Sequence, residues 1–147
     1  MRAVLTRQEG VHFEVRTDFG GRFDVDGAPA IGGKERGARP METLLAALGA
    51  CSSMDVVAIL DKQRQVIGGM VVTVNGEREV DVVPSLFKTI HVDFAFTGEL
   101  DAGKAARAVE LSMGKYCSVT RIVEKTATVT HSCTVNGVEA RAGEGAE

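Results

Sequence analysis

The most continuous hydrophobic stretch of the chain covers residues 40–60 and predicts one long helix. Its interior consists mainly of Ala, Leu, Met and Val, and Pro40 suits a first helical position because its missing N–H would have no partner there. Glu42 complements the positive end of the helix dipole. Apolar residues occupy nearly every face, so we expect a helix that is buried on most sides.

Before this helix, polar and apolar residues alternate, which predicts a β-meander. Its expected strands cover residues 2–7, 11–18 and 22–26. Glycine and other turn residues then dominate over 28–39, and the segment has no hydrophobic period. We therefore expect a loop there. It lacks the residue order of a phosphate-binding loop, which argues against a nucleotide site.

After the helix, further strands and two shorter helices are predicted. The strands cover residues 70–80, 87–97 and 125–135, and the alternation is cleanest over 87–97. Asp101 is a suitable N-cap for a helix to about Met113, and a second short helix is expected from Cys117 to Glu124. An Asn136-Gly137 turn then leads into a frayed tail.

This order of elements indicates an α+β protein with mainly antiparallel sheet, because repeated βαβ units are not predicted. We expect a single domain over residues 1–147. Its parts are a meander and loop (1–39), a central helix (40–63), strands with two short helices (70–135) and a tail (136–147). A helix that is apolar on all sides needs more cover than one small sheet provides, so an oligomer is expected.

Charge and composition narrow the possible partners. A net charge of −3 with a quarter of the residues charged gives no reason to expect nucleic acid or an acidic membrane surface as partner. The N-terminal residues have no apolar core segment of a secretory signal, which predicts a cytoplasmic protein. A membrane span is not expected, because Ser52, Ser53 and Asp55 interrupt an apolar run shorter than about 20 residues.

Three cysteines argue for free, metal-bound or redox-active thiols rather than a disulfide framework. Cys51 and Asp55 lie one helical turn apart on one face of the long helix. Cys117 lies at a predicted helix start, where unpaired N–H groups and the dipole lower a thiol pKa. Ionisation of Cys51 needs a cation from elsewhere. The candidates in or beside the preceding loop are Arg22, Arg36 and Arg39.

Simpler interpretations of these residues stay open. Cysteine is often just a small buried residue, and this is the expected role of Cys133 on the apolar face of the last strand. Neither a metal site nor a cofactor is expected, because the chain has no Cys-x-x-Cys pair and His131-x-Cys133 lacks a partner pair. His12 and His91 lie in strands and are expected to be solvated or hydrogen-bonded.

Two cysteine blocks resemble those of a known family. Residues 40–57, with Pro-Met-Glu at the helix start and Cys51-Ser-Ser-Met-Asp-Val-Val, are similar to the first cysteine helix of the OsmC/Ohr family of osmotically inducible and organic-hydroperoxide-resistance proteins. Residues 112–119 resemble its second cysteine segment. The resemblance covers essentially the whole chain and is closest to the subgroup called OsmC-like putative redox proteins. It implies an OsmC-like fold in which antiparallel sheets pack around long central helices of an intertwined homodimer.

The resemblance also implies a thiol-dependent peroxidase. Cys51 would attack an organic hydroperoxide and become a sulfenic acid, and Cys117 would condense with it to a disulfide. An external dithiol, such as a lipoyl-type dithiol, would reduce that disulfide. An apolar substrate pocket would be lined by residues such as Leu48, Met54 and Phe94.

Two activating residues are carried over from the family as expectations. In the organic-hydroperoxide branch a glutamate directly follows the proline and pairs with an arginine. Here Met41 has that position and Glu42 comes one residue later, which is about 100° around the helix. Gly20-Gly21-Arg22 resembles the arginine turn of the family, so Arg22 is the expected partner.

Two other functions are compatible with these residues. The same fold could hold a small apolar ligand without catalysis, its cysteines being packing residues. A thiol redox sensor could use the Cys51–Cys117 disulfide to change a partner surface. Co-purified ligand with inert thiols would favour the first alternative, and a persistent oxidised form with a new partner would favour the second.

Overall fold

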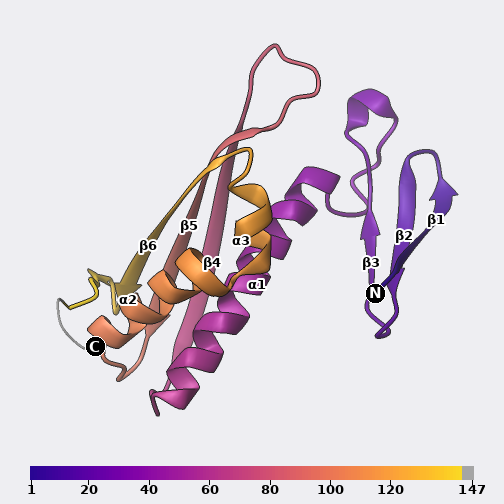
Figure 1. Ribbon diagram of the computed structural model, residues 1–147. Coiled ribbons are helices and arrows are strands. Elements are labelled where there is room, and N and C mark those ends of the chain that lie inside the picture. The colour runs from indigo at the N-terminus through magenta and orange to yellow at the C-terminus, as the bar shows by residue number, and fades with distance from the viewer. Residues whose placement is uncertain (144–147) are drawn as a thin grey trace. The chain divides into compact units, whose positions relative to one another are not determined.

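The computed structural model describes residues 1–143 and divides the chain into two compact units, Met1–Leu44 and Leu45–Glu147 (Figure 1). The mixed α+β class predicted from the sequence is confirmed. The single domain expected over residues 1–147 stays a prediction beside these two units. The last four residues of the expected tail lie outside the described part of the chain.

The N-terminal unit contains the expected meander. Its three strands pair antiparallel in the order β1-β2-β3, with bounds Ala3–Glu9, His12–Thr17 and Arg22–Val25. All residues of β1 are exposed, whereas β2 buries Glu14 and Val15. This small sheet therefore forms little core of its own.

Asp26 organises the loop that follows β3. Its side chain is only 2% exposed, and its carboxylate accepts backbone N–H groups from Lys34 (2.9 Å), Arg36 (3.1 Å) and Gly27 (2.8 Å). The N–H groups of Lys34 and Arg36 are the main reason why the pKa of this carboxyl lies below its ordinary value. One buried carboxylate thus holds the glycine-rich segment, which also contains a short 3-10 turn at Pro29–Ile31.

The long helix α1 covers Pro40–Lys62, close to the predicted 40–63. Its first turn is capped by Glu42, whose carboxylate accepts the backbone N–H of Arg39 at 2.9 Å. Thr43 donates its hydroxyl to the carbonyl of the same arginine at 3.2 Å. The predicted helix start is confirmed, and Glu42 has a structural contact of its own there.

A single chain covers α1 only in part, and burial on most sides, which was expected with an oligomer, stays a prediction. One face is buried, and the opposite face is an apolar stripe formed by exposed Ala46, Ala47, Ala50, Met54, Val57 and Ala58. A single chain therefore does not bury this helix on most sides. By length and composition alone α1 could cross a membrane, since its best window has a mean hydropathy of 1.9 and is 28% buried. The core helix of a protein without a membrane span passes the same test, so the expectation of no membrane span stays a prediction.

The C-terminal unit contains a four-stranded sheet in the order β4-β5-β6-β7. The bounds of its strands are Gly69–Arg78, Phe87–Thr97, Thr128–Val135 and Val138–Glu139. Antiparallel pairing joins β4 to β5 and β6 to β7, but β5 and β6 are parallel. Parallel pairing needs a long crossover, which the helices between Thr97 and Thr128 provide. The short strand β7 also corrects the prediction of a tail that frays directly after Asn136-Gly137.

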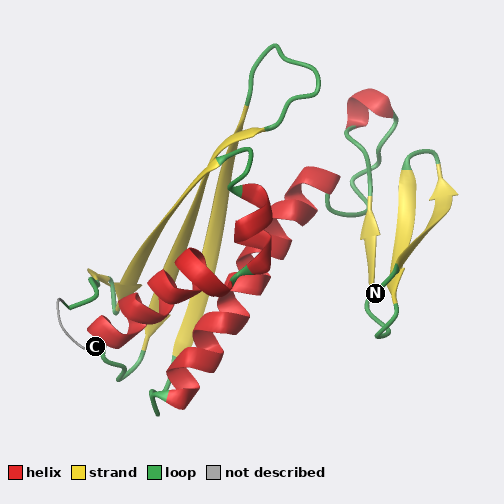
Figure 2. Cartoon of the chain, viewed as in Figure 1, coloured by secondary structure: helices red, strands yellow, loops and turns green. Residues whose placement is uncertain are grey.

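Helices α1, α2 and α3 cover one face of this sheet (Figure 2). Helix α2 spans Ala102–Leu111, begins as predicted at Asp101, and leads through a π-helical turn, Ser112–Tyr116, into α3, Ser118–Val123. Gly49 lets α1 approach β4 closely, because a Cβ there would lie 2.9 Å from Val74 Cγ2. The core between helices and sheet includes Leu48, Val56, Leu60, Ile90, Val92, Phe94, Phe96 and Val109.

Candidate active site

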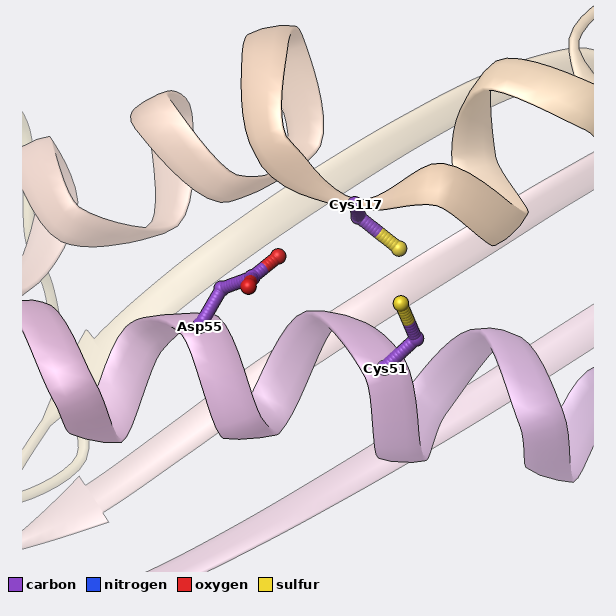
Figure 3. A group of neighbouring side chains, drawn as sticks. All are labelled: Cys51, Asp55 and Cys117. Carbon is purple, nitrogen blue, oxygen red and sulfur yellow. The ribbon is translucent and has the colours of Figure 1, made fainter.

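Three reactive side chains from two distant segments converge within the C-terminal unit. The sulfurs of Cys51 and Cys117 and a carboxylate oxygen of Asp55 all lie within 4.8 Å of one another. Figure 3 shows the two sulfurs directed toward each other, with Asp55 one turn along α1 from Cys51. All three cysteines of the chain are free thiols. The predicted meeting of the first and second cysteine segments is therefore present in the geometry.

The position of Cys117 depends on the π-helical turn before it. The wider turn closes where the N–H of Cys117 donates to the carbonyl of Ser112 at 2.9 Å. Cys117 then leaves the helical conformation (φ −66°, ψ 106°) and caps α3, its sulfur accepting the N–H of Thr120 at 3.4 Å. This confirms that Cys117 stands at a helix start, and its side chain is fully buried.

The ionisation of Cys117 is opposite to the expectation. Burial raises the pKa of its thiol above the ordinary value, and the hydrogen bonds from Thr120 only partly offset this effect. The neighbouring Cys51 raises the pKa further. The prediction of a thiolate stabilised by the helix start was wrong, because desolvation outweighs the hydrogen bonds from Thr120. Cys117 is held as a neutral thiol.

Ser112 links the π-helical turn to α1. Its buried hydroxyl lies 3.1 Å from the carbonyl oxygen of Ser52 and 3.2 Å from Oδ2 of Asp55. The contact orients the carboxylate toward the sulfurs. The sequence reasoning missed this residue, and its only signal was its place at the start of the second cysteine block.

Cys133 is separate from this group. It lies on β6, is 5% exposed, and burial raises the pKa of its thiol to about 11. Its predicted role as a core residue is confirmed, and it offers a matched control for experiments on the other two thiols.

His12 and His91 lie in strands and are hydrogen-bonded, as predicted. His12 Nε2 lies 2.8 Å from a carboxylate oxygen of Asp24. The ring nitrogens of His91 lie 2.8 Å and 2.9 Å from the hydroxyls of Thr130 and Ser132. These contacts account for both ring nitrogens of His91, whereas the Nδ1 of His12 is buried without a hydrogen-bond partner among residues 1–143.

Two of the three arginines expected as activating cations form ion pairs within the N-terminal unit. Arg22 forms an ion pair with Glu14. Arg36 forms one with Glu9 at 2.8 Å. The activating roles of Arg22 and Glu42 stay predictions.

The structure does not support the predicted lining of the substrate pocket. Leu48 and Phe94 are fully buried in the core, whereas Met54 is 71% exposed, so the three cannot line one open cavity. A cavity of about 320 Å³ lies elsewhere in the C-terminal unit, between the end of α2 and strand β6. Its lining includes Val109, Glu110, His131, Cys133 and Arg141.

The convergent group also has the composition of a metal ligand set. Two sulfurs and a carboxylate oxygen are donors that zinc accepts. The sequence-based expectation of no metal site rested on the missing Cys-x-x-Cys pair. A missing sequence motif does not exclude ligands that are far apart in sequence and that the fold brings together from α1 and the start of α3.

The sequence also matches known proteins. A family model described as OsmC-like protein matches residues 32–132. Protein YhfA of Escherichia coli strain K12 is 38% identical over 133 residues, which cover 90% of this chain and 96% of that protein.

Solved structures extend the match to the fold. A hypothetical protein from Aquifex aeolicus VF5 is 26% identical with a TM-score of 0.76, and the match covers 92% of this chain and 96% of that one. The organic hydroperoxide resistance protein OhrB of Bacillus subtilis is 21% identical with a TM-score of 0.62, with 91% and 98% covered. The match to OhrB, at 21% identity, shows that this chain shares its fold.

Proposed function

The chain belongs to the OsmC-like protein family, and from this premise we propose that it is a thiol-dependent peroxidase that reduces organic hydroperoxides. The observation that carries the proposal is the convergence of the Cys51 and Cys117 sulfurs within 4.8 Å. The similarity to the organic hydroperoxide resistance protein OhrB of Bacillus subtilis supports the substrate class. The two thiols supply the two electrons that cleavage of one O–O bond requires.

In the first step, the Cys51 thiolate attacks the terminal oxygen of the hydroperoxide. A new S–O bond forms, the O–O bond breaks, and the alkoxide leaves and takes a proton from solvent as the alcohol. Cys51 becomes a sulfenic acid. It is the better attacking group of the pair because Cys51 is partly exposed, whereas Cys117 is fully buried.

In the second step, the sulfur of Cys117 attacks the Cys51 sulfenic acid. The S–S bond forms, the S–O bond breaks, and the thiol proton leaves with the hydroxide as water. A neutral, buried Cys117 suits this role, since it does not compete for the peroxide. An external dithiol, such as a lipoyl-type dithiol, then reduces the disulfide by exchange and is itself oxidised.

Activation of Cys51 is proposed to involve Arg22 and Glu42, following the family pattern. Each also has a contact that supports its own local structure, namely the ion pair with Glu14 and the cap of α1. Substitutions there should therefore be judged on rate constants of properly folded protein.

The direct test is turnover by reduced wild-type protein. With cumene hydroperoxide and an excess of a lipoyl-type dithiol, we expect continuous peroxide consumption with one alcohol formed per disulfide produced. Consumption is followed by loss of peroxide, and a protein-free reaction gives the background. No consumption by fully reduced protein would refute the peroxidase. Co-purified apolar ligand beside inert thiols would then favour a binding protein, and a persistent disulfide with a new partner would favour a sensor.

We also propose a cytoplasmic homodimer in which the apolar stripe of α1 lies against a second copy of the chain. The stripe runs over three turns of the helix and includes Met54 and Val57, which are 71% and 37% exposed. Burying such a stripe removes apolar surface from water, which stabilises association. It would make α1 a core helix instead of a membrane span.

Met54→Glu is expected to shift this dimer to monomers. In the dimer, the carboxylate would be buried and unpaired at the centre of the stripe. Burying such a charge destabilises the dimer by roughly 3–5 kcal/mol. Light scattering after gel filtration should give twice the chain mass of 15.6 kDa for the wild type and 15.6 kDa for the variant. Val138→Glu is the control, because Val138 is 69% exposed but lies on β7. A wild-type monomer would contradict the proposal.

A further inference from the structure

The group of Cys51, Asp55 and Cys117 has a second capability that does not depend on peroxide chemistry. We propose that, in the reduced protein, these three side chains bind one Zn²⁺ ion. The three donor atoms already lie within 4.8 Å of one another (Figure 3). They come from two elements, α1 and the cap of α3, so an ion would connect the two elements.

The spacing fits a tetrahedral ion. Zinc binds thiolate sulfur at about 2.3 Å and carboxylate oxygen at about 2.0–2.2 Å, which places neighbouring donors roughly 3.6–3.8 Å apart. The donors lie within 4.8 Å of one another, so the proposal requires them to move closer by about 1 Å or less, and the side chains of Cys51 and Asp55 are both partly exposed. Three protein ligands leave the fourth position to water. Thiolate donors select zinc over Mg²⁺ and Ca²⁺, which prefer oxygen.

Neighbouring groups orient two of the three donors. The Ser112 hydroxyl contacts Oδ2 of Asp55, which leaves the other carboxylate oxygen available to an ion. The N–H of Thr120 holds the sulfur of Cys117. Outer contacts of this kind fix ligand orientation in metal sites. Both contacts are part of the reduced structure, so little has to be ordered when the ion binds.

The ion binds the deprotonated thiols, whose two negative charges a divalent cation balances. Binding therefore releases the thiol protons to solvent, and affinity increases with pH.

Zinc and the disulfide exclude each other, because they use the same two sulfurs. Oxidation of the zinc-bound pair by one hydroperoxide and two solvent protons yields the disulfide, free Zn²⁺, the alcohol and water. The two electrons come from the two thiolates, and the zinc is not oxidised or reduced. The ion would thus protect the pair from oxidation and be released when oxidation succeeds.

The test is a zinc titration of reduced, metal-free protein against a chromophoric chelator, without peroxide. We expect one zinc per chain in the wild type and none after oxidation to the disulfide. Asp55→Asn should weaken binding, and Ser112→Ala should weaken it roughly 10–100-fold, as loss of an outer contact does. Cys51→Ser and Cys117→Ser should each cost more than that. Cys133→Ser is the matched control and should bind as the wild type does.

A spectroscopic readout distinguishes this site from adventitious binding. Co²⁺ in place of zinc should give a thiolate-to-metal charge-transfer band and the visible bands of a tetrahedral ion, both lost in Cys117→Ser. Absence of zinc binding by the reduced wild type, or unchanged binding by Cys117→Ser, would overturn the proposal. Because no peroxide is present, that outcome leaves the peroxidase untouched. Zinc binding by thiols that do not react with peroxide would refute the peroxidase alone.

Discussion

Cys51→Ser is expected to abolish hydroperoxide consumption, whereas Cys117→Ser should consume one peroxide per chain and then stop. Serine at position 51 offers no thiolate, and its alcohol does not cleave an O–O bond under these conditions. Without Cys117 the sulfenic acid still forms but lacks its partner within 4.8 Å. The measurement is peroxide loss over time, with a sulfenic-acid-trapping reagent and mass spectrometry to find the modified residue.

Cys133→Ser supplies the control for this pair. Its sulfur is buried on β6 and lies outside the convergent group, so activity should remain near that of the wild type. The trapped adduct should be on Cys51 in the Cys117→Ser variant. Continued turnover by Cys51→Ser, or an adduct on Cys117, would reverse or remove the assigned roles.

The regular elements were predictable because their signals are local. The N-cap at Asp101, the helix start at Pro40 and the alternation over 87–97 each depend on residues close in sequence. The parallel pairing of β5 with β6 was missed because it depends on the path of a long crossover. Apolar surface left uncovered on α1 was expected, but composition does not report which of its residues form the exposed stripe.

The candidate site was predictable only in part. Resemblance in two blocks identified Cys51 and Cys117, and the helix period identified Asp55 as a neighbour of Cys51. The buried Ser112 contact and the direction of the Cys117 pKa depend on tertiary packing, which no local pattern reports. The N–H donors at the start of α3, which lower the pKa of Cys117, were visible in the sequence. The desolvation that raises this pKa was not.

Phe94→Ala is expected to cause a large loss of stability in the C-terminal unit. Phe94 is fully buried on β5, where it pairs with Val72 on β4 and Cys133 on β6. Truncation of a buried phenylalanine costs about 3–5 kcal/mol, since it removes apolar contacts and leaves a cavity. That is a large fraction of the roughly 5–15 kcal/mol that holds a typical domain together.

Urea unfolding at one fixed protein concentration measures this loss, because the stability of a dimer depends on concentration. Phe94→Leu should lose less, as it keeps most of the volume, and Lys88→Ala on the exposed side of β5 should change stability by about 0.5 kcal/mol or less. Phe94 lies outside the thiol group, so well below the unfolding transition the alanine variant should keep the single-turnover rate of the wild type. A loss of stability under about 1 kcal/mol would contradict the core assignment, since a cavity of that size does not close at so small a cost. If Phe94→Ala keeps its stability but loses the single-turnover rate, Phe94 contacts the reacting groups. The sheet would then position the thiols through this side chain and not only through α1.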